Sequence, residues 1–106
     1  MLTTSDLTTG ERLLIERRRA GQNQTQAAHA YDLSEWRYRQ CEADEADLIA
    51  SPPLGRLQIH EACVIMRRRV GMKRTDLAEQ LDISCWWLTQ MERGQIPADR
   101  LVTYWS

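Results

Sequence analysis

The sequence predicts an all-α fold made of two tandem copies of one small helical unit. The main observation is an internal repeat, in which residues 11–45 match residues 61–95 at a constant offset of 50 positions. Thirteen of the 35 aligned positions are identical, and the match needs no gap. An internal repeat of this kind marks a repeated structural unit. No stretch of useful length alternates between apolar and polar residues, so the sequence favours helices over strands.

The repeated residues stand where short helices would begin, pack and end. In both copies an arginine triplet is soon followed by a glycine, and a later serine precedes a tryptophan by two positions. Glycine commonly ends a helix, and serine commonly caps the start of one. The repeated residues of the first copy, each recurring 50 positions later, are Glu11, Ile15, Arg17, Arg18, Arg19, Gly21, Thr25, Ala28, Asp32, Ser34, Trp36, Gln40 and Glu42.

Length and charge limit the domain organisation and the partners. A chain of 106 residues makes one domain or two very small ones, and we expect units in residues 1–50 and 51–106. The net charge is −1, but residues 1–50 carry 6 basic and 9 acidic side chains, whereas residues 51–106 carry 8 and 6. The local placement of charge governs DNA affinity more than the total does, so DNA remains a candidate partner.

Several function classes find no support in the sequence. No apolar run is long enough to cross a membrane and the first residues do not resemble a signal peptide, so we expect a cytoplasmic protein. Cys41, Cys63 and Cys85 lack the close pairing of zinc ligands, and we expect free, mostly buried thiols. Because no catalytic triad, carboxylate pair or phosphate-binding loop is recognisable, we expect no enzyme activity, cofactor, metal or small-molecule substrate.

The second copy predicts four helices. Its first helix ends at Gly71, and its second covers residues 73–81. Its third is capped by Ser84 and ends near Arg93, and a last helix begins near residues 97–99. The first copy has the same pattern of terminators and caps. The side chains expected to face inward are Ala28, Tyr31, Tyr38, Cys41, Ala78, Leu88, Met91 and Leu101.

The strongest internal break is Ser51-Pro52-Pro53, between the two copies. A serine followed by proline is typical of a helix start. We therefore expect one long or slightly broken helix from this point to Arg69, which would be both the last element of the first copy and the first element of the second.

Within each copy, two helices of about eight residues are joined by a short turn, and the second is capped by serine, which is the helix-turn-helix pattern. Ala28 and Ala78 provide the small residue needed where the helices cross, and Leu33 and Ile83 provide an apolar residue in the turn. Such a pair of helices would project the first turn of its second member outward.

The stretch from Gly71 to Ser84, followed by Met91-Glu92-Arg93-Gly94 and Pro97, resembles the phage-repressor/Cro-like (xenobiotic-response-element-type) helix-turn-helix family. The resemblance covers most of each half of the chain. It implies two tandem lambda-repressor-like helix-turn-helix bundles of four to five short helices each, whose third helix enters the major groove. The first copy is similar through Gly21, Asn23-Gln24, Ala28, Leu33-Ser34 and Glu42.

The resemblance also implies which residues would contact DNA. At the start of the second helix of each copy, Gln24, Lys73 and Arg74 would approach phosphates. The third helix and its capping serine would supply the base contacts. These positions are Ser34, Glu35, Trp36, Arg37 and Gln40 in the first copy, and Ser84, Cys85, Trp86, Trp87 and Gln90 in the second.

Four further residues are expected to belong to the scaffold. Members of the family often pair an arginine of the first helix with the glutamate that ends the third. The resemblance therefore implies the ion pairs Arg17–Glu42 and Arg67–Glu92. Removing one member of such a pair would cost more than the pair contributes, because an uncompensated charge is left behind.

The charged and amide side chains of the first copy have alternative roles. Arg37 and Gln40 carry the donors that grip guanine and adenine, but they could also lie on a solvated face. Glu35 could accept a hydrogen bond from cytosine, or it could pair with Arg39.

The tryptophans leave three alternatives open. Trp36 and Trp86 occupy the same position of the repeat and could pack between helices, contact DNA or bind a partner. Trp87 follows directly, and neighbours on a helix lie about 100° apart, so both cannot enter one small core. We expect Trp87 to contact DNA or a partner protein.

The sequence favours a sequence-specific DNA-binding transcription regulator, such as a repressor, whose two units read half-sites of double-stranded DNA, alone or as a homodimer. A small protein of this kind is typical of phage, plasmid or mobile-element control. The alternative is an antiactivator of the same fold that binds a second regulator through Trp86 and Trp87, since large exposed aromatics often mark interfaces. The acidic residues that favour this alternative, because they would repel phosphates, are Glu42, Asp44, Glu45 and Asp47.

Overall fold

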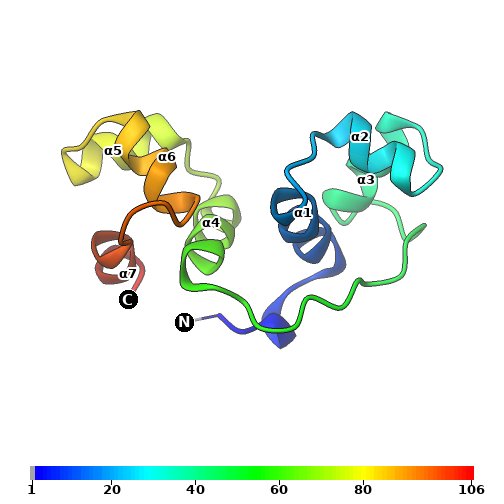
Figure 1. The fold of residues 1–106 in the computed structure, drawn as a ribbon, viewed down its shortest axis with the longest axis horizontal. Coiled ribbons are helices and arrows are strands. Elements are labelled where there is room, and N and C mark those ends of the chain that lie inside the picture. The colour runs from blue at the N-terminus through cyan, green and yellow to red at the C-terminus, as the bar shows by residue number, and fades with distance from the viewer. Residues whose placement is uncertain (1) are drawn as a thin grey trace. The chain divides into compact units, whose positions relative to one another are not determined.

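The computed structural model describes residues 2–106, which form seven α-helices, one short 3-10 helix and no strand (Figure 1). The all-α prediction is therefore confirmed. The described residues divide into two compact units, Leu2–Arg56 and Leu57–Ser106, whereas the sequence had suggested a division at residues 50 and 51. The two are called unit one and unit two below.

Unit one contains the 3-10 helix Thr4–Asp6, α1 (Thr9–Arg19), α2 (Gln24–Ala30) and α3 (Glu35–Glu42). Helix α3 packs against both α1 and α2. Of the inward residues expected here, Ala28, Tyr38 and Cys41 are in the core, whereas Tyr31 is only partly buried and packs against it. The core residues of unit one are Leu13, Ala27, Ala28, Tyr38, Cys41 and Ile49.

Unit two contains α4 (Ile59–Val70), α5 (Arg74–Leu81), α6 (Cys85–Glu92) and α7 (Asp99–Trp105). Helix α6 packs against α4 and α5, and α7 packs against α4. The expected bounds of its second, third and last helices and the expected end of its first helix are confirmed to within one or two residues. Its core residues are Cys63, Leu77, Ala78, Leu81, Leu88, Met91 and Leu101.

The third helix of each copy begins as the sequence predicts. The Ser34 hydroxyl accepts a hydrogen bond from the Arg37 amide at 3.2 Å, and the Ser84 hydroxyl accepts one from the Trp87 amide at 3.1 Å. Each such cap satisfies an amide that has no partner within its helix. The two serines are therefore structural caps, which set where α3 and α6 start.

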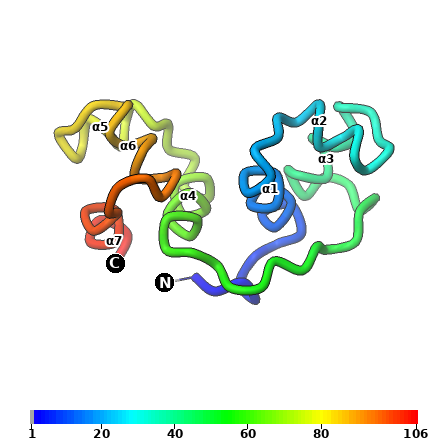
Figure 2. The backbone as a smooth tube through the Cα atoms, viewed as in Figure 1, coloured from blue at the N-terminus to red at the C-terminus, as the bar shows by residue number. Residues whose placement is uncertain are grey.

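The segment between the copies differs from the expectation. Residues 51–58 are not helical, and α4 begins only at Ile59 (Figure 2). Pro53 disfavours the helical conformation of Pro52, which would be the first helical residue after a Ser51 cap, so a helix cannot easily start here. Because no shared helix forms, α4 belongs to unit two alone, and unit one has three α-helices instead of four or five.

Residues 49–56, called the strap below, lie against unit one. The Arg19 guanidinium donates to the carbonyl oxygens of Leu54 at 2.6 Å and Arg56 at 2.8 Å. Ile49 and Leu54 are buried. A helix would need these carbonyls for its own ladder, so the arginine contacts and the apolar anchors favour an extended strap.

Candidate nucleic-acid interface

The face of α3 that points away from the core is defined by what the helix buries. Tyr38, Cys41 and Glu42 are buried, and successive residues are about 100° apart around a helix. Trp36 and Gln40, four residues apart, therefore lie opposite the core. Trp36 is 67% exposed, which rules out the helix-packing role considered for it.

Helix α6 presents the same two residue types in the same places. It buries Leu88, Met91 and Glu92, so that Trp86 and Gln90 lie opposite the core. Trp86 is 63% exposed and likewise does not pack between helices. A Trp-x-x-x-Gln pair that faces away from the core is thus common to both copies.

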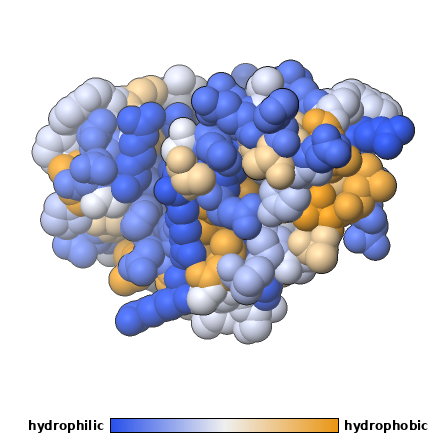
Figure 3. Space-filling model, turned by 45° about the vertical axis from the view of Figure 1, so that its right-hand side comes forward, coloured by the Kyte–Doolittle hydropathy of each residue, from blue (hydrophilic) through white to orange (hydrophobic). Residues whose placement is uncertain are grey.

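The flanks of the two pairs differ in chemistry. Arg37 and Arg39 flank the pair on α3, whereas Trp87 and Thr89 flank it on α6. Trp87 is 46% exposed, and its ring centroid lies 6.0 Å from that of Trp86. Helix α6 carries no charged residue on this face, since its one carboxylate belongs to the buried Glu92. Apolar patches are also visible among polar surface on the face of the molecule drawn in Figure 3.

Of the three charged side chains of α3 other than the buried Glu42, two pair with each other and one does not. Arg39 binds Glu35 at 2.7 Å, four residues apart on the same helix, so the ion-pair alternative for Glu35 holds. The exposed guanidinium of Arg37 has no hydrogen-bond or ion-pair partner among residues 2–106, and neither has the side-chain amide of Gln40 or Gln90. These three side chains have all their donors available for a ligand.

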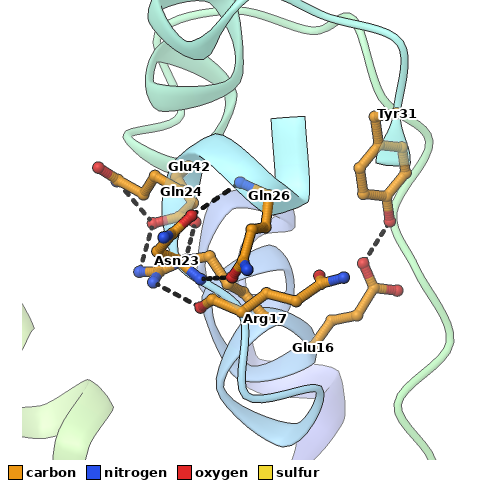
Figure 4. A network of polar contacts seen from close by, with 8 residues as sticks. Glu16, Arg17, Asn23, Gln24, Gln26, Tyr31 and Glu42 are labelled. Atoms are coloured by element: carbon orange, nitrogen blue, oxygen red, sulfur yellow. Dashed lines mark hydrogen bonds and ion pairs between the residues drawn. The ribbon is translucent and has the colours of Figure 1, made fainter. Parts of the chain in front are cut away.

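A buried glutamate joins the three helices of unit one (Figure 4). Two nitrogens of Arg17 donate to the Glu42 carboxylate at 2.6 and 3.2 Å, which confirms the predicted ion pair. Gln24, at the start of α2, donates its amide to the same carboxylate at 3.3 Å. Arg17 also donates to the Gln22 carbonyl at 3.3 Å, so α1, the turn before α2 and the end of α3 are held together.

Unit two repeats this arrangement with one change. Arg67 donates to the Glu92 carboxylate at 2.7 and 3.1 Å, which confirms the second predicted ion pair. Arg74 occupies the place of Gln24 and donates to the same carboxylate at 3.1 Å. Gln24 and Arg74, both predicted to contact phosphate, therefore also hold the scaffold. Arg74 keeps 41% of its side chain exposed, and the neighbouring Lys73 is exposed as well.

The acidic residues after α3 are less available than the sequence suggested. Glu42 is buried in the network just described. Asp44 turns back to α1, where its carboxylate accepts from the Gly10 amide at 2.8 Å and from the Thr8 hydroxyl at 2.6 Å. Of the four residues expected to repel phosphates, only Glu45 and Asp47 are exposed without such a structural contact.

The cysteines fall into two groups. Cys41 and Cys63 are buried free thiols, as expected, and burial raises the pKa of Cys63 to about 11. Cys85 is exposed at the first position of α6, next to the tryptophan pair.

Two structural contacts escaped the sequence reasoning. A Cβ on Gly10 would come within 2.3 Å of the Glu42 carbonyl oxygen, while in unit two a Cβ on Gly94 would lie 2.8 Å from the His60 ring. In the repeat Gly10 aligns with His60, and Asp44 aligns with Gly94. Each copy thus has one glycine in this pair of positions, at the first position in unit one and at the second in unit two. This alternation is the sequence signal for a close contact between the two positions.

Comparison of the chain with protein-family models, curated proteins and solved structures found no match. Among residues 2–106, no helix has both the length and the apolar character needed to span a membrane. The local geometry of α3 and α6 is therefore the main support for any function.

Proposed function

We propose that this protein is a sequence-specific DNA-binding transcription regulator with two tandem lambda-repressor-like helix-turn-helix units. Helices α3 and α6 are its recognition helices. The observation that carries the proposal is the repeated outward pair, Trp36 with Gln40 and Trp86 with Gln90. A fold alone would need only the buried positions to be alike in the two copies, so a shared outward pair indicates a shared ligand.

The chemistry of the outward faces suits base edges in the major groove. A glutamine amide can donate to adenine N7 and accept from adenine N6, and arginine can donate to guanine O6 and N7. Gln40, Gln90 and Arg37 have no partners among the described residues that would compete for these donors. The indole rings of Trp36 and Trp86 can make apolar contact with a thymine methyl group or with sugars.

The scaffold supports the same proposal. In each unit the buried glutamate ties the end of the third helix to the first helix and to the start of the second. Such a network holds the recognition helix in one orientation, which base readout requires. Unit two adds Lys73 and Arg74 at the start of α5, where they can approach a phosphate.

The direct test is selection of bound duplexes from a random DNA library at about 0.15 M salt. An enriched motif is the expected result. If no motif is enriched, and only weak binding that salt removes is seen, the proposal is overturned, because contacts to phosphates alone carry no sequence information.

Single variants then test the assigned face. Gln40→Ala and Gln90→Ala are each expected to weaken binding to the selected duplex by roughly 5- to 150-fold. Gln95→Ala is the matched control, because Gln95 is an exposed glutamine beyond the end of α6. Unchanged affinity in both test variants would show that the outward pair is not the reading face.

One observation favours a second function, an antiactivator that binds another regulator protein. The outward face of α6 has no charge and exposes Trp86 and Trp87, a composition found at the centres of protein interfaces. Under this alternative the library selection enriches no motif, and Trp87→Ala weakens association of the chain with its protein partner. Sedimentation of the chain with DNA and with a candidate regulator separates the two cases, and Thr89→Ala on the other flank serves as the control.

A further inference from the structure

We infer that the two units read different half-sites, which share one base pair and differ at a neighbouring one because Arg37 and Trp87 occupy equivalent places. This inference rests on the proposed function and specifies the DNA sequence that it would recognise.

The shared contact comes from the residues opposite the core. Gln40 and Gln90 occupy the same position of the repeat, and each follows an outward tryptophan by one helical turn. Two identical amides in identical places on two helices of equal length should read the same base. Adenine is the base that a glutamine amide grips with two hydrogen bonds.

The difference lies on one flank of that pair. Arg37 and Trp87 each stand three residues before the shared glutamine, and both are exposed. The Arg37 guanidinium carries only donors, and guanine is the base that offers two acceptors in the major groove. Trp87 offers an apolar ring and one donor, so an A·T pair with its thymine methyl group suits it better than a G·C pair.

The opposite flank is occupied by contacts within each helix. Arg39 is held by Glu35 at 2.7 Å in α3, and the Thr89 hydroxyl donates to the Cys85 carbonyl at 2.8 Å in α6. These side chains would have to break a local contact before reading a base. Position 37 of unit one and position 87 of unit two are therefore the ones that distinguish the half-sites.

The test compares library selections for the natural chain, Trp87→Arg and Thr89→Arg. The natural chain should select two half-sites that share an adenine, with a G·C pair beside it in only one of them. Trp87→Arg should convert the second half-site to the first, with roughly a 5- to 150-fold preference for G·C at the new position. Thr89→Arg adds the same charge to the same helix on the other flank and should leave the preference at that base pair unchanged.

The outcomes separate this inference from the proposed function. Half-sites that are already identical in the natural chain, or a motif that Trp87→Arg does not alter, overturn the inference and leave DNA reading intact. A preference for G·C that appears equally in Thr89→Arg also overturns it, because charge alone would then explain the change. No enriched motif with any chain overturns the proposed function and the inference together. Positions 87 and 89 lie outside the core, and circular dichroism confirms that the variants are folded.

Discussion

The two units differ at the contact between their first and third helices. In each unit one of two aligned positions is a glycine and the other carries a side chain that covers it, but the glycine is at the first position in unit one and at the second in unit two. In unit one the small residue is Gly10 on α1, and Asp44 after α3 reaches over it to bind its amide. In unit two the small residue is Gly94 after α6, and the ring of His60 on α4 lies over it. This contact has room for one side chain, and either element can supply it.

The units also differ in what completes their cores. Unit two is completed by α7, which buries Leu101. Unit one has no helix at this place and instead buries Ile49 of the strap in its core, while Arg19 binds the strap carbonyls of Leu54 and Arg56. The core of the repeated helices can therefore be covered either by a helix or by an extended segment. Either one suffices if it buries an apolar side chain and its backbone groups are hydrogen-bonded.

The buried glutamates should reveal the largest difference between the units. Arg17→Ala is expected to lower the free energy of unfolding of unit one by about 3–5 kcal/mol, because it removes the guanidinium paired with Glu42. Arg67→Ala should cost less, because Arg74 gives Glu92 a second guanidinium where Gln24 gives Glu42 only an amide. Denaturant unfolding with hydrogen exchange resolved by helix measures each unit, and equal losses would contradict the comparison.

Exchanging the residues at the contact between the first and third helices tests the difference between Gly10 with Asp44 and His60 with Gly94. Gly10→His alone should destabilise unit one by about 1–3 kcal/mol, since its Cβ would meet the Glu42 carbonyl oxygen. Adding Asp44→Gly should recover part of this loss by imitating the arrangement of unit two. A double-mutant cycle by thermal unfolding measures the coupling. Strictly additive losses would show that the two positions do not compensate each other.

Releasing the strap should have a smaller effect. Arg19→Ala removes the guanidinium bonded to the Leu54 and Arg56 carbonyls, and we expect a loss of about 1–2 kcal/mol. Trypsin should then cleave after Arg56 faster than in the natural chain. Arg37→Ala, which removes an exposed guanidinium of the same unit, is the control and should leave the rate unchanged. If both variants are cleaved alike, Arg19 does not hold the strap.

The smallest expected difference is in alkaline stability. Burial, followed by a hydrogen bond to Glu16, raises the pKa of Tyr31 to about 12, from 10 in the unfolded chain. The folded state keeps the proton longer, so this contribution is present below pH 10 and is lost as the pH rises toward 12. In unit two the raised pKa of Cys63 gives a lower window, between about 9 and 11.

Variants that remove each group check these windows. Stability curves of Tyr31→Phe should be flatter than those of the natural chain between pH 10 and 12. Those of Cys63→Ala should be flatter between pH 9 and 11. Parallel curves would mean that neither group is linked to unfolding in its unit.

Much of the candidate site followed from the sequence because it depends on local rules. Ser34 and Ser84 place the starts of α3 and α6, and helical periodicity then determines which residues face outward. The ion pairs Arg17–Glu42 and Arg67–Glu92 were expected from the resemblance and are present. Sequence reasoning left the tryptophans undecided, because an apolar ring fits a core as well as an exposed face.

By itself, the sequence determined the all-α class, the repeat, most helix bounds and most inward residues, because caps and periodicity act over one or two turns. Tertiary structure decided the strap, the inward turn of Asp44 and the double role of Gln24 and Arg74. These contacts join residues far apart in the chain. Local patterns carry no information about a partner that only folding brings near.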